Sequence, residues 1–290
     1  MSLSEMKIQK IIILAIVFVS LSQCKKNTEE SYSNLNIVMD NAQAALYFHT
    51  VFCEAENAWA FADINKYEDK TDVSDTKKKL TYFHSIKDKG NDSVAIEYQD
   101  WELKNHLSLT GKIIVTFDND SSYRVNQKRA NVLLDDFSIN GQTVAGEATI
   151  TYRKTATNPN DQYTYTLLNG SYICETGTSA MLITCVIANG QYERIEENET
   201  IAQDDDDVWA FSGVMTGTLH DDPNLKYKNT VPATPYTLND EPKDGKIRFT
   251  KNCKTAGEGS SQIEIAKRPD IIYFYGCSEL YFESTTHHIR

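Results

Sequence analysis

The stretch that decides the fold runs from residue 137 to residue 173 and is FSINGQTVAGEATITYRKTATNPNDQYTYTLLNGSYI. It contains two Asn-Gly pairs, at 140–141 and 169–170, and these residues tolerate the positive φ that a tight hairpin turn requires. Between the pairs, apolar and polar residues alternate over 149–152 and 163–166. Such alternation is typical of strands with one buried and one wet face. The stretch therefore predicts consecutive antiparallel strands.

The same signals continue toward the C-terminus. Asn189-Gly190 and Asp244-Gly245 are two further turn pairs, and alternation recurs over 246–249 and 262–265. The chain has 290 residues with 16 Tyr, 13 Gly and 6 Pro, a composition that favours a folded, strand-rich protein over a disordered one. We predict a mainly β fold in which residues 93–290 form a large antiparallel meander, as a twisted sheet or a partly closed barrel.

A helix precedes the strands. From Leu35 to about Ile64, apolar residues recur every three or four positions, with Asn34 placed to cap the start. They are Val38, Ala42, Ala45, Phe48, Phe52, Ala55, Trp59 and Ala62. A helix that binds a membrane surface is typically flanked by Lys and Arg, whereas this one carries Asp40, Glu54 and Glu56. We therefore expect an amphipathic helix packed on the sheet.

The N-terminus has the features of a lipoprotein signal. Lys7 and Lys10 precede an apolar run over 11–19, and the sequence LSQC follows at 21–24. The run is too short to span a hydrocarbon core, which needs about 20 residues, so we interpret residues 1–23 as a signal peptide and Cys24 as the lipidated residue. Removing this leader changes the formal net charge from −12 to −13, because Lys7 and Lys10 outweigh Glu5.

The rest of the domain plan follows from composition. Residues 24–33 are polar and are interpreted as a tether, and residues 34–92 as the helix followed by a charged linker with a helical turn. The acidic balance argues against nucleic-acid binding, since the short basic run at 77–79 stands beside Asp72 and Asp75. The expected partners are the membrane, through the lipid, and an unidentified envelope protein or glycan.

Five cysteines remain once Cys24 is acylated, an odd number for an oxidising compartment. Cys174 and Cys185 lie symmetrically about positions 179 and 180, so a hairpin turning over 177–180 is expected to place them face to face in a disulfide.

Cys253 and Cys277 are the other natural pair, and closing a loop of that size contributes about 3 kcal/mol on the loop-entropy model. Cys53 is then left over. Its place in the apolar stripe of the helix favours a buried, inert thiol.

Several groups have residue types that suit a chemical site, and for each the structural interpretation is favoured. His49, Cys53 and Glu56 share a helix face but lack further ligands of recognisable spacing for zinc. The acidic run at 204–207 lacks the turn glycine of a calcium loop. His220 stands beside Asp221 and Asp222, and the sugar-stacking candidates are Trp101, Trp209 and Tyr236. We expect no catalytic residue, no metal ligand and no cofactor, and we expect the aromatic residues to lie in the core.

The pattern resembles a group of uncharacterised β-rich lipoproteins of Bacteroidota, over most of the chain. The segments that carry the resemblance are the lipobox at 21–24, the helix after it, GKIIV at 111–115, FSING at 137–141, VAGEAT at 144–149, WAFSG at 209–213, and GKI at 245–247 with Cys253 and Cys277. The resemblance implies an envelope location and a β-rich fold. No activity is assigned to the group.

The expected function is that of an outer-membrane lipoprotein, on the periplasmic face or the cell surface, acting as a non-enzymatic binding or structural module. The alternatives are an envelope hydrolase acting on polysaccharide or peptide, and an accessory subunit of a transport or secretion complex. An exposed apolar patch favours the subunit. Two carboxylates about 5 to 10 Å apart in a pocket favour the hydrolase.

Overall fold

The computed structural model describes residues 36–65, 70–83, 92–118, 122, 124–155, 157–176, 179–195, 208–218, 226–233, 236–238, 241–243, 245–249, 259–265, 268–276 and 279–284. These segments contain one helix, over residues 36–64, and sixteen strands. The strands are β1 (Lys70–Asp75), β2 (Lys78–Phe83), β3 (Ser93–Glu102), β4 (Ser108–Phe117), β5 (Arg129–Ile139), β6 (Gln142–Thr155), β7 (Asn158–Thr176), β8 (Ser179–Ile195), β9 (Val208–Thr218), β10 (Lys226–Val231), β11 (Tyr236–Leu238), β12 (Glu241–Lys243), β13 (Ile247–Phe249), β14 (Ser260–Ile265), β15 (Ile271–Gly276) and β16 (Glu279–Ser284).

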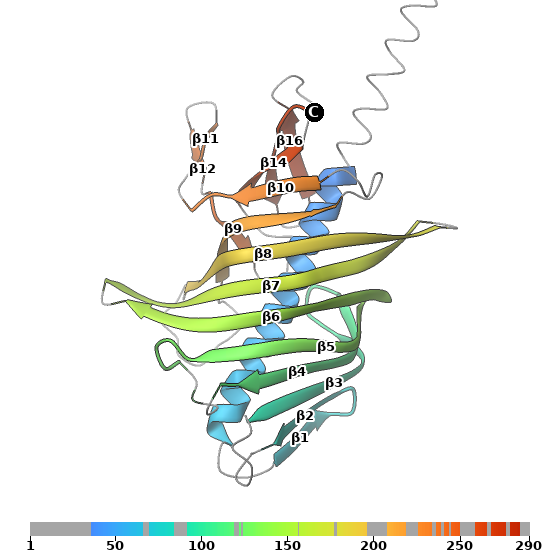
Figure 1. Ribbon diagram of the computed structural model, residues 1–290, viewed down its shortest axis with the longest axis vertical. Helices are drawn as coiled ribbons and strands as arrows, with labels where there is room; N and C mark the ends of the chain where they lie inside the picture. Colours follow the sequence, from blue (N-terminus) through green and yellow to red (C-terminus); the bar gives the residue numbers. More distant parts are fainter. Residues whose placement is uncertain are drawn as a thin grey trace, which may run out of the picture.

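The predicted antiparallel meander is confirmed. Thirteen strands pair in the order β1 to β10 and then β14, β15 and β16, and β13 joins the same sheet by pairing with β9. β11 and β12 form a separate two-stranded sheet. The order starts at β1 and ends at β16, so the large sheet is open, and Figure 1 shows its twist from end to end.

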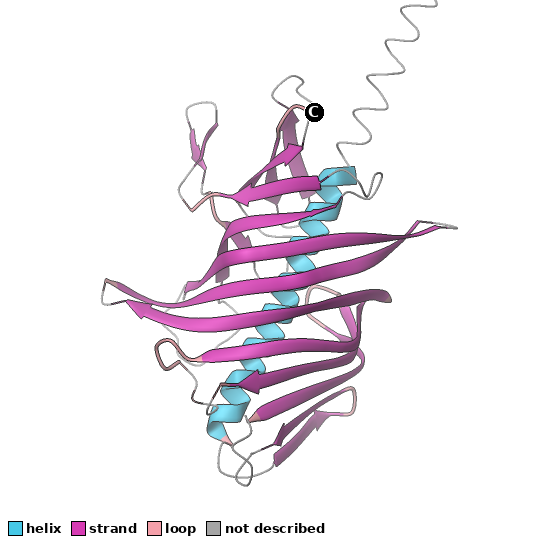
Figure 2. Cartoon of the chain, in the orientation of Figure 1, coloured by secondary structure: helices cyan, strands magenta, loops and turns pink. Residues whose placement is uncertain are grey.

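The predicted helix is confirmed over its described residues, and it crosses the strands of the sheet along the long axis of the molecule (Figures 1 and 2). All eight residues of its apolar stripe are buried. Burial extends well beyond that stripe, since only Met39, Asn57 and Ile64 of the helix are exposed. The sheet therefore curls around the helix, which fills the hollow side.

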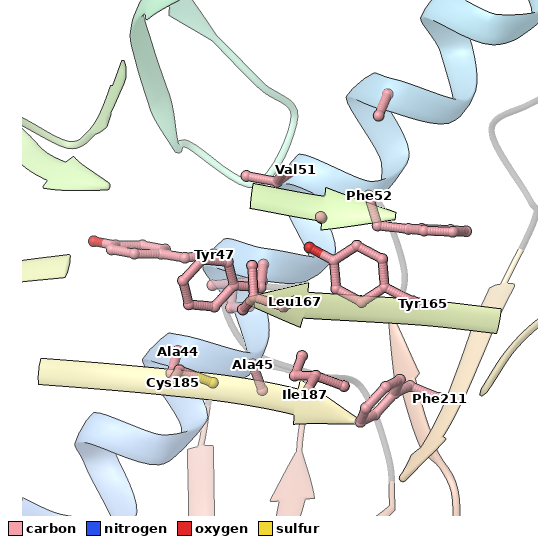
Figure 3. Packing of buried hydrophobic residues seen from close by; sticks show 14 of the residues in the cluster. Ala44, Ala45, Tyr47, Val51, Phe52, Tyr165, Leu167, Cys185, Ile187 and Phe211 are labelled. Carbon is pink, nitrogen blue, oxygen red and sulfur yellow. The ribbon is translucent and has the colours of Figure 1, made fainter. Parts of the chain in front are cut away.

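The core between helix and sheet consists largely of aromatic and small residues. Figure 3 shows Ala44, Ala45 and Tyr47 of the helix beside Leu167 and Cys185 of the strands, with Phe52 close to Tyr165. The ring of Phe52 stacks on Tyr192 at 4.0 Å between centroids and meets Trp209 edge to face at 5.1 Å. Alanines let the helix backbone approach the sheet, while the large rings fill the space beside it.

One of the four turn predictions is confirmed. Asn140 and Gly141 have φ values of 52° and 75° and join β5 to β6, as a tight hairpin turn with positive φ at both central residues requires. Asn169-Gly170 and Asn189-Gly190 were wrongly predicted as turns, because they lie inside β7 and β8. There the pairing shifts register, so Asn169 and Asn189 use their positive φ in β-bulges.

The Asp244-Gly245 prediction also fails as a hairpin, because β12 pairs with β11 whereas β13 pairs with β9. Asp244 itself lies outside the described residues.

Glycines in adjacent strands permit the bulges. A Cβ placed on Gly146 in β6 would lie 3.0 Å from Cα of Gly170 in β7, and one on Gly213 in β9 would lie 2.9 Å from Cα of Gly190 in β8. Gly146 and Gly213 also have positive φ, at 146° and 154°. Each pair thus lets two backbones come closer than side chains allow.

The segment interpreted as a charged linker contains a hairpin, so that interpretation was wrong. β1 and β2 pair with each other, and β2 continues into the main sheet by pairing with β3. Leu80 and Tyr82 alternate with polar neighbours in β2, and Tyr82 is fully buried. High charge density concealed this period-two pattern, because the outer side of the strands is charged.

The Cys174–Cys185 disulfide prediction is also wrong. β7 ends at Thr176 and β8 starts at Ser179, and these two residues pair, which centres the turn two residues earlier than expected. Cys185 consequently lies opposite Gly170, and it is a free, buried thiol. Burial raises the pKa of Cys185 to about 12. Cys253 and Cys277 lie outside the described residues, so that pairing stays a prediction.

Candidate functional site

Several polar residues of the helix are buried with the apolar ones. Glu54 and Glu56 are 5% and 6% exposed, and His49 is 8% exposed. A buried charge is stable only when neighbouring groups compensate for its lost hydration. The surroundings of these three residues therefore define where the molecule concentrates its chemistry.

Glu56 belongs to a polar cluster that joins the helix to β7. The hydroxyl of Tyr163 in β7 donates to its Oε1 at 3.0 Å, and Nη2 of Arg124 lies 3.9 Å from the same oxygen. Arg124 also places Nε 3.0 Å from Oδ2 of Asp161, whose Oδ1 accepts from the hydroxyl of Tyr152 at 2.8 Å. One guanidinium thus bridges two carboxylates, one on the helix and one at the start of β7.

Burial raises the pKa of Glu56 from 4.5 to about 7, although Arg124, the Tyr163 hydroxyl and Arg194 all favour its charged form. Desolvation is the larger effect because the carboxyl lies beneath the sheet. The pKa of the Tyr163 hydroxyl is raised as well, first by burial and then by the nearby Glu56. A carboxyl group with a pKa near neutrality can exchange a proton under ordinary conditions.

A second cluster adjoins the first along β7. Glu193 Oε1 accepts from the amides of Asn158 and Asn160 at 2.8 and 2.9 Å, and its Oε2 lies 2.7 Å from Nζ of Lys246. Burial acts to raise the pKa of Glu193, but these donors outweigh it and lower the pKa to about 2. Glu193 is therefore ionised at ordinary pH, and it lies near the C-terminal end of β8.

Glu54 is held by β2 and β3. Its Oε2 lies 2.7 Å from Nζ of Lys78 and accepts from the hydroxyl of Tyr98 at 2.5 Å. The Lys78 ammonium also lies 5.7 Å from the ring centroids of Tyr98 and Trp101. The carboxylate, the ammonium and two rings thus form a closed group that fixes the helix to β2 and β3.

His49 is the third of these buried residues. Its ring stacks on Phe249 of β13 at 3.8 Å and 9°, and Nε2 lies 3.4 Å from Sγ of Cys53. Burial lowers the pKa of His49 to about 3, so the imidazole is neutral. Cys53 is half-buried against the core. No group of three or more metal-ligating side chains occurs in the part of the chain that the structure describes.

The aromatic residues considered for sugar stacking lie in different environments. Trp209 is 8% exposed and lies among Phe52, Tyr163 and Tyr192, which confirms its interpretation as a core residue. Trp101 is half-buried beneath Lys78.

The side chain of Tyr236 lies outside the described residues, as do Cys24, the acidic run at 204–207, and His220 with its two aspartates. The structure therefore does not describe the lipidation site, the acidic run or the His220 group.

The outer face of the sheet, which points away from the helix, carries two kinds of surface. Lys79, Glu97, Lys112 and Asp135 alternate in charge across β2 to β5, with N to O distances of 3.8 to 3.9 Å. Further along, Leu133 pairs with Glu147, and Glu147 pairs with Leu168. These two leucines are 46% and 52% exposed, and Leu182 of β8 is 55% exposed. Leu182 pairs with Ile173, five residues along β7 from Leu168, and therefore lies apart. We call Leu133, Glu147 and Leu168 the outer aliphatic patch.

Sequence reasoning missed Arg124 and Asp161. No local pattern joins them to Glu56, because they belong to the β4–β5 connection and to β7. Glu54 and Glu56 carried a usable signal, since both fall among apolar residues on a helix that has few exposed positions.

The fold defines a class: an open antiparallel meander, mainly β, with one helix in its hollow side. No protein-family model matches the chain, and neither the curated proteins nor the solved structures contain a match. The likeness to Bacteroidota lipoproteins stays a prediction from sequence.

The one helix in the described segments, over residues 36–64, does not combine the length and the apolar character that crossing a bilayer requires.

Proposed function

We propose that the chain is an outer-membrane lipoprotein, anchored through lipid on Cys24, whose folded part serves as a non-enzymatic binding or structural module of the cell envelope. The basic and apolar leader and the LSQC motif at 21–24 support the anchor.

The observation that carries the non-enzymatic role is how the buried carboxylates are used. Glu54 accepts from Tyr98 and pairs with Lys78, and Glu56 accepts from Tyr163 and faces Arg124. Each set joins the helix to the rest of the fold, so these groups stabilise the packing of the helix against the sheet. With the hollow side filled by the helix, binding falls to the outer face and the edges of the sheet.

The outer aliphatic patch favours a protein partner, and with it the role of an accessory subunit. Leu133 and Leu168 stand on either side of the exposed Glu147 in one row across β5, β6 and β7. Aliphatic side chains in the middle of a sheet face gain stability when a partner covers them. A basic group opposite Glu147 would complete the match.

Two experiments test this proposal. Cys24→Ala should move the protein from the outer-membrane fraction to the soluble fraction, and retention in the membrane would overturn the lipid anchor. A photo-cross-linking residue at Leu168 or Leu133 should capture one and the same envelope protein in intact cells. The same residue at Glu97, in the charged part of the outer face, is the matched control. Capture from position 97 alone, or no capture from either leucine, would overturn the binding role of the patch.

One observation favours the hydrolase as a second candidate. Glu56, with a pKa of about 7, and Asp161 lie on the same guanidinium, and glycosidases pair a protonated with an ionised carboxyl. If this pair is catalytic, hydrolysis of envelope glycans by the purified protein should be lost in both Glu56→Gln and Asp161→Asn, and kept in Glu193→Gln. Absence of hydrolysis across a glycan panel would reject the candidate.

A further inference from the structure

The connection between β4 and β5 folds back against β6. The amide of Gln127 donates to the carbonyl of Tyr152 at 3.0 Å, and the amide of Tyr152 donates to the carbonyl of Lys128 at 3.1 Å. The side chain of Asn126 accepts from the amide of Lys154 at 3.2 Å. Residues 126–128 thus extend the pairing of β5 with β6 and bring Arg124 to the start of β7.

The backbone of this segment is strained. Arg124 and Gln127 have φ values of 55° and 67°, in the left-handed region that residues with a Cβ seldom occupy. Such conformations persist where surrounding contacts fix them. For Arg124 such contacts are made by the guanidinium, and the side chain as a whole is 35% exposed.

Two carboxyl groups lie near different nitrogen atoms of this guanidinium. Asp161 of β7 lies 3.0 Å from Nε, and Glu56 of the helix lies 3.9 Å from Nη2. The other charged or titratable groups facing Glu56 are Tyr163 of β7 and Arg194 of β8, while Tyr152 of β6 donates to Asp161.

We propose that Arg124, Asp161 and Glu56 form a pH-dependent clasp, in which ionised Glu56 holds the segment 124–128 against the helix and neutral Glu56 releases that hold. Ionisation gives the guanidinium a second anionic partner at the helix. Protonation removes that second anionic partner while Asp161 and the hydrogen bond with Tyr163 stay in place, so the hold on the strained backbone of Arg124 weakens.

The pKa of about 7 for Glu56, raised mainly by burial, places this change between about pH 6 and pH 8. His49, whose pKa is lowered to about 3, and Glu193, whose pKa is lowered to about 2, keep constant charge in that interval. Linkage makes the effect reciprocal: each pKa unit by which Arg124 favours ionised Glu56 strengthens the clasp about tenfold when Glu56 ionises.

The amides of Gln127 and Lys128 report on the clasp, since the first donates to Tyr152 and the second to the carbonyl of Val125 at 3.0 Å. We would measure their hydrogen exchange in the whole protein from pH 5.5 to pH 8.5, corrected for the intrinsic pH dependence of exchange. Protection is expected to rise several-fold with a midpoint near pH 7. Equal protection at both ends of the range would overturn the proposal.

Three variants separate the clasp from general stability. Glu56→Gln should give low protection that does not change with pH near 7. A rise in protection near pH 7 that persists in Glu56→Gln would overturn the proposal. Asp161→Asn should lower protection throughout and keep the rise. Glu193→Gln removes a neighbouring carboxylate that does not face Glu56, and its rise should equal that of the unmodified protein. Circular dichroism spectra verify folding, and a carboxyl ¹³C titration of Glu56 in Arg124→Met should show a raised pKa.

Discussion

Lys78 in β2 lies 2.7 Å from the carboxylate of Glu54 in the helix, and the two side chains are only 18% and 7% exposed. Removing one partner of such a pair leaves a buried charge without compensation. We expect Lys78→Met to lower the free energy of unfolding by about 2 to 3 kcal/mol, measured by urea denaturation at pH 8. Lys79→Met is the control, because Lys79 is the next residue and belongs to the exposed charged residues of β2 to β5. It should lower the free energy of unfolding by less than about 0.5 kcal/mol. Equal effects of the two variants would contradict the structural role of Glu54.

Glu56 makes stability depend on pH. Its pKa of about 7 in the folded protein exceeds the ordinary value of 4.5, so between these values the folded state keeps a proton that the unfolded state has lost. The stabilisation is therefore fully present below pH 4.5 and is lost as pH rises through 7, at up to about 1.4 kcal/mol per pH unit. Denaturant titrations should show that Glu56→Gln lacks this loss. A Gln variant with the same pH profile as the unmodified protein would contradict the assignment.

His49 acts in the opposite direction. Its pKa falls from 6.5 to about 3 on folding, so its contribution is present above pH 6.5 and is lost as pH falls toward 3. Between pH 4.5 and 6.5 the slopes from His49 and Glu56 oppose each other. The unmodified protein should therefore show a flat profile there, while Glu56→Gln gains stability with rising pH. His49→Phe, which keeps a ring against Phe249, should lose stability with rising pH over the same interval.

Two glycines with positive φ offer a matched pair for testing the bulges. A Cβ on Gly111 would lie 2.0 Å from the carbonyl oxygen of Asp136, whereas one on Gly141 would meet nothing within 4 Å. Both positions strain an alanine backbone, by about 1 kcal/mol. Gly141→Ala should cost about that amount by thermal or urea denaturation. Gly111→Ala should cost at least about 2 kcal/mol more, because two backbones must separate. Equal costs would show that the close approach of β4 and β5 is not required.

The sequence predicts those features of the fold that have a local period. The apolar stripe from Val38 to Ala62 has the helical spacing, and alternation over 149–152 and 163–166 marks β6 and β7, so both were identified correctly. Asn-Gly pairs were ambiguous because a positive φ serves a hairpin turn at Asn140 and a bulge at Asn169 equally well. Choosing between them depends on the neighbouring strands.

The candidate site lay beyond local patterns. Glu56 was interpreted as a polar flank, whereas the curled sheet encloses that side of the helix and forces the carboxyl to find Tyr163 and Arg124. The Tyr163–Glu56 hydrogen bond joins residues 107 positions apart. No pattern near either residue in the sequence predicts this contact. It depends on the combined registers of several paired strands.

The order of the strands has a consequence for how the molecule assembles. Most neighbours in the sheet are also neighbours along the chain, so strands can add one after another through short connections, a route with a low entropic cost. The helix is different, because it is synthesised first and yet contacts strands as distant as β7 and β13. Its apolar and carboxylate side chains therefore stay exposed to solvent until most of the sheet has formed. We therefore expect the packing of the helix to complete an otherwise sequential assembly.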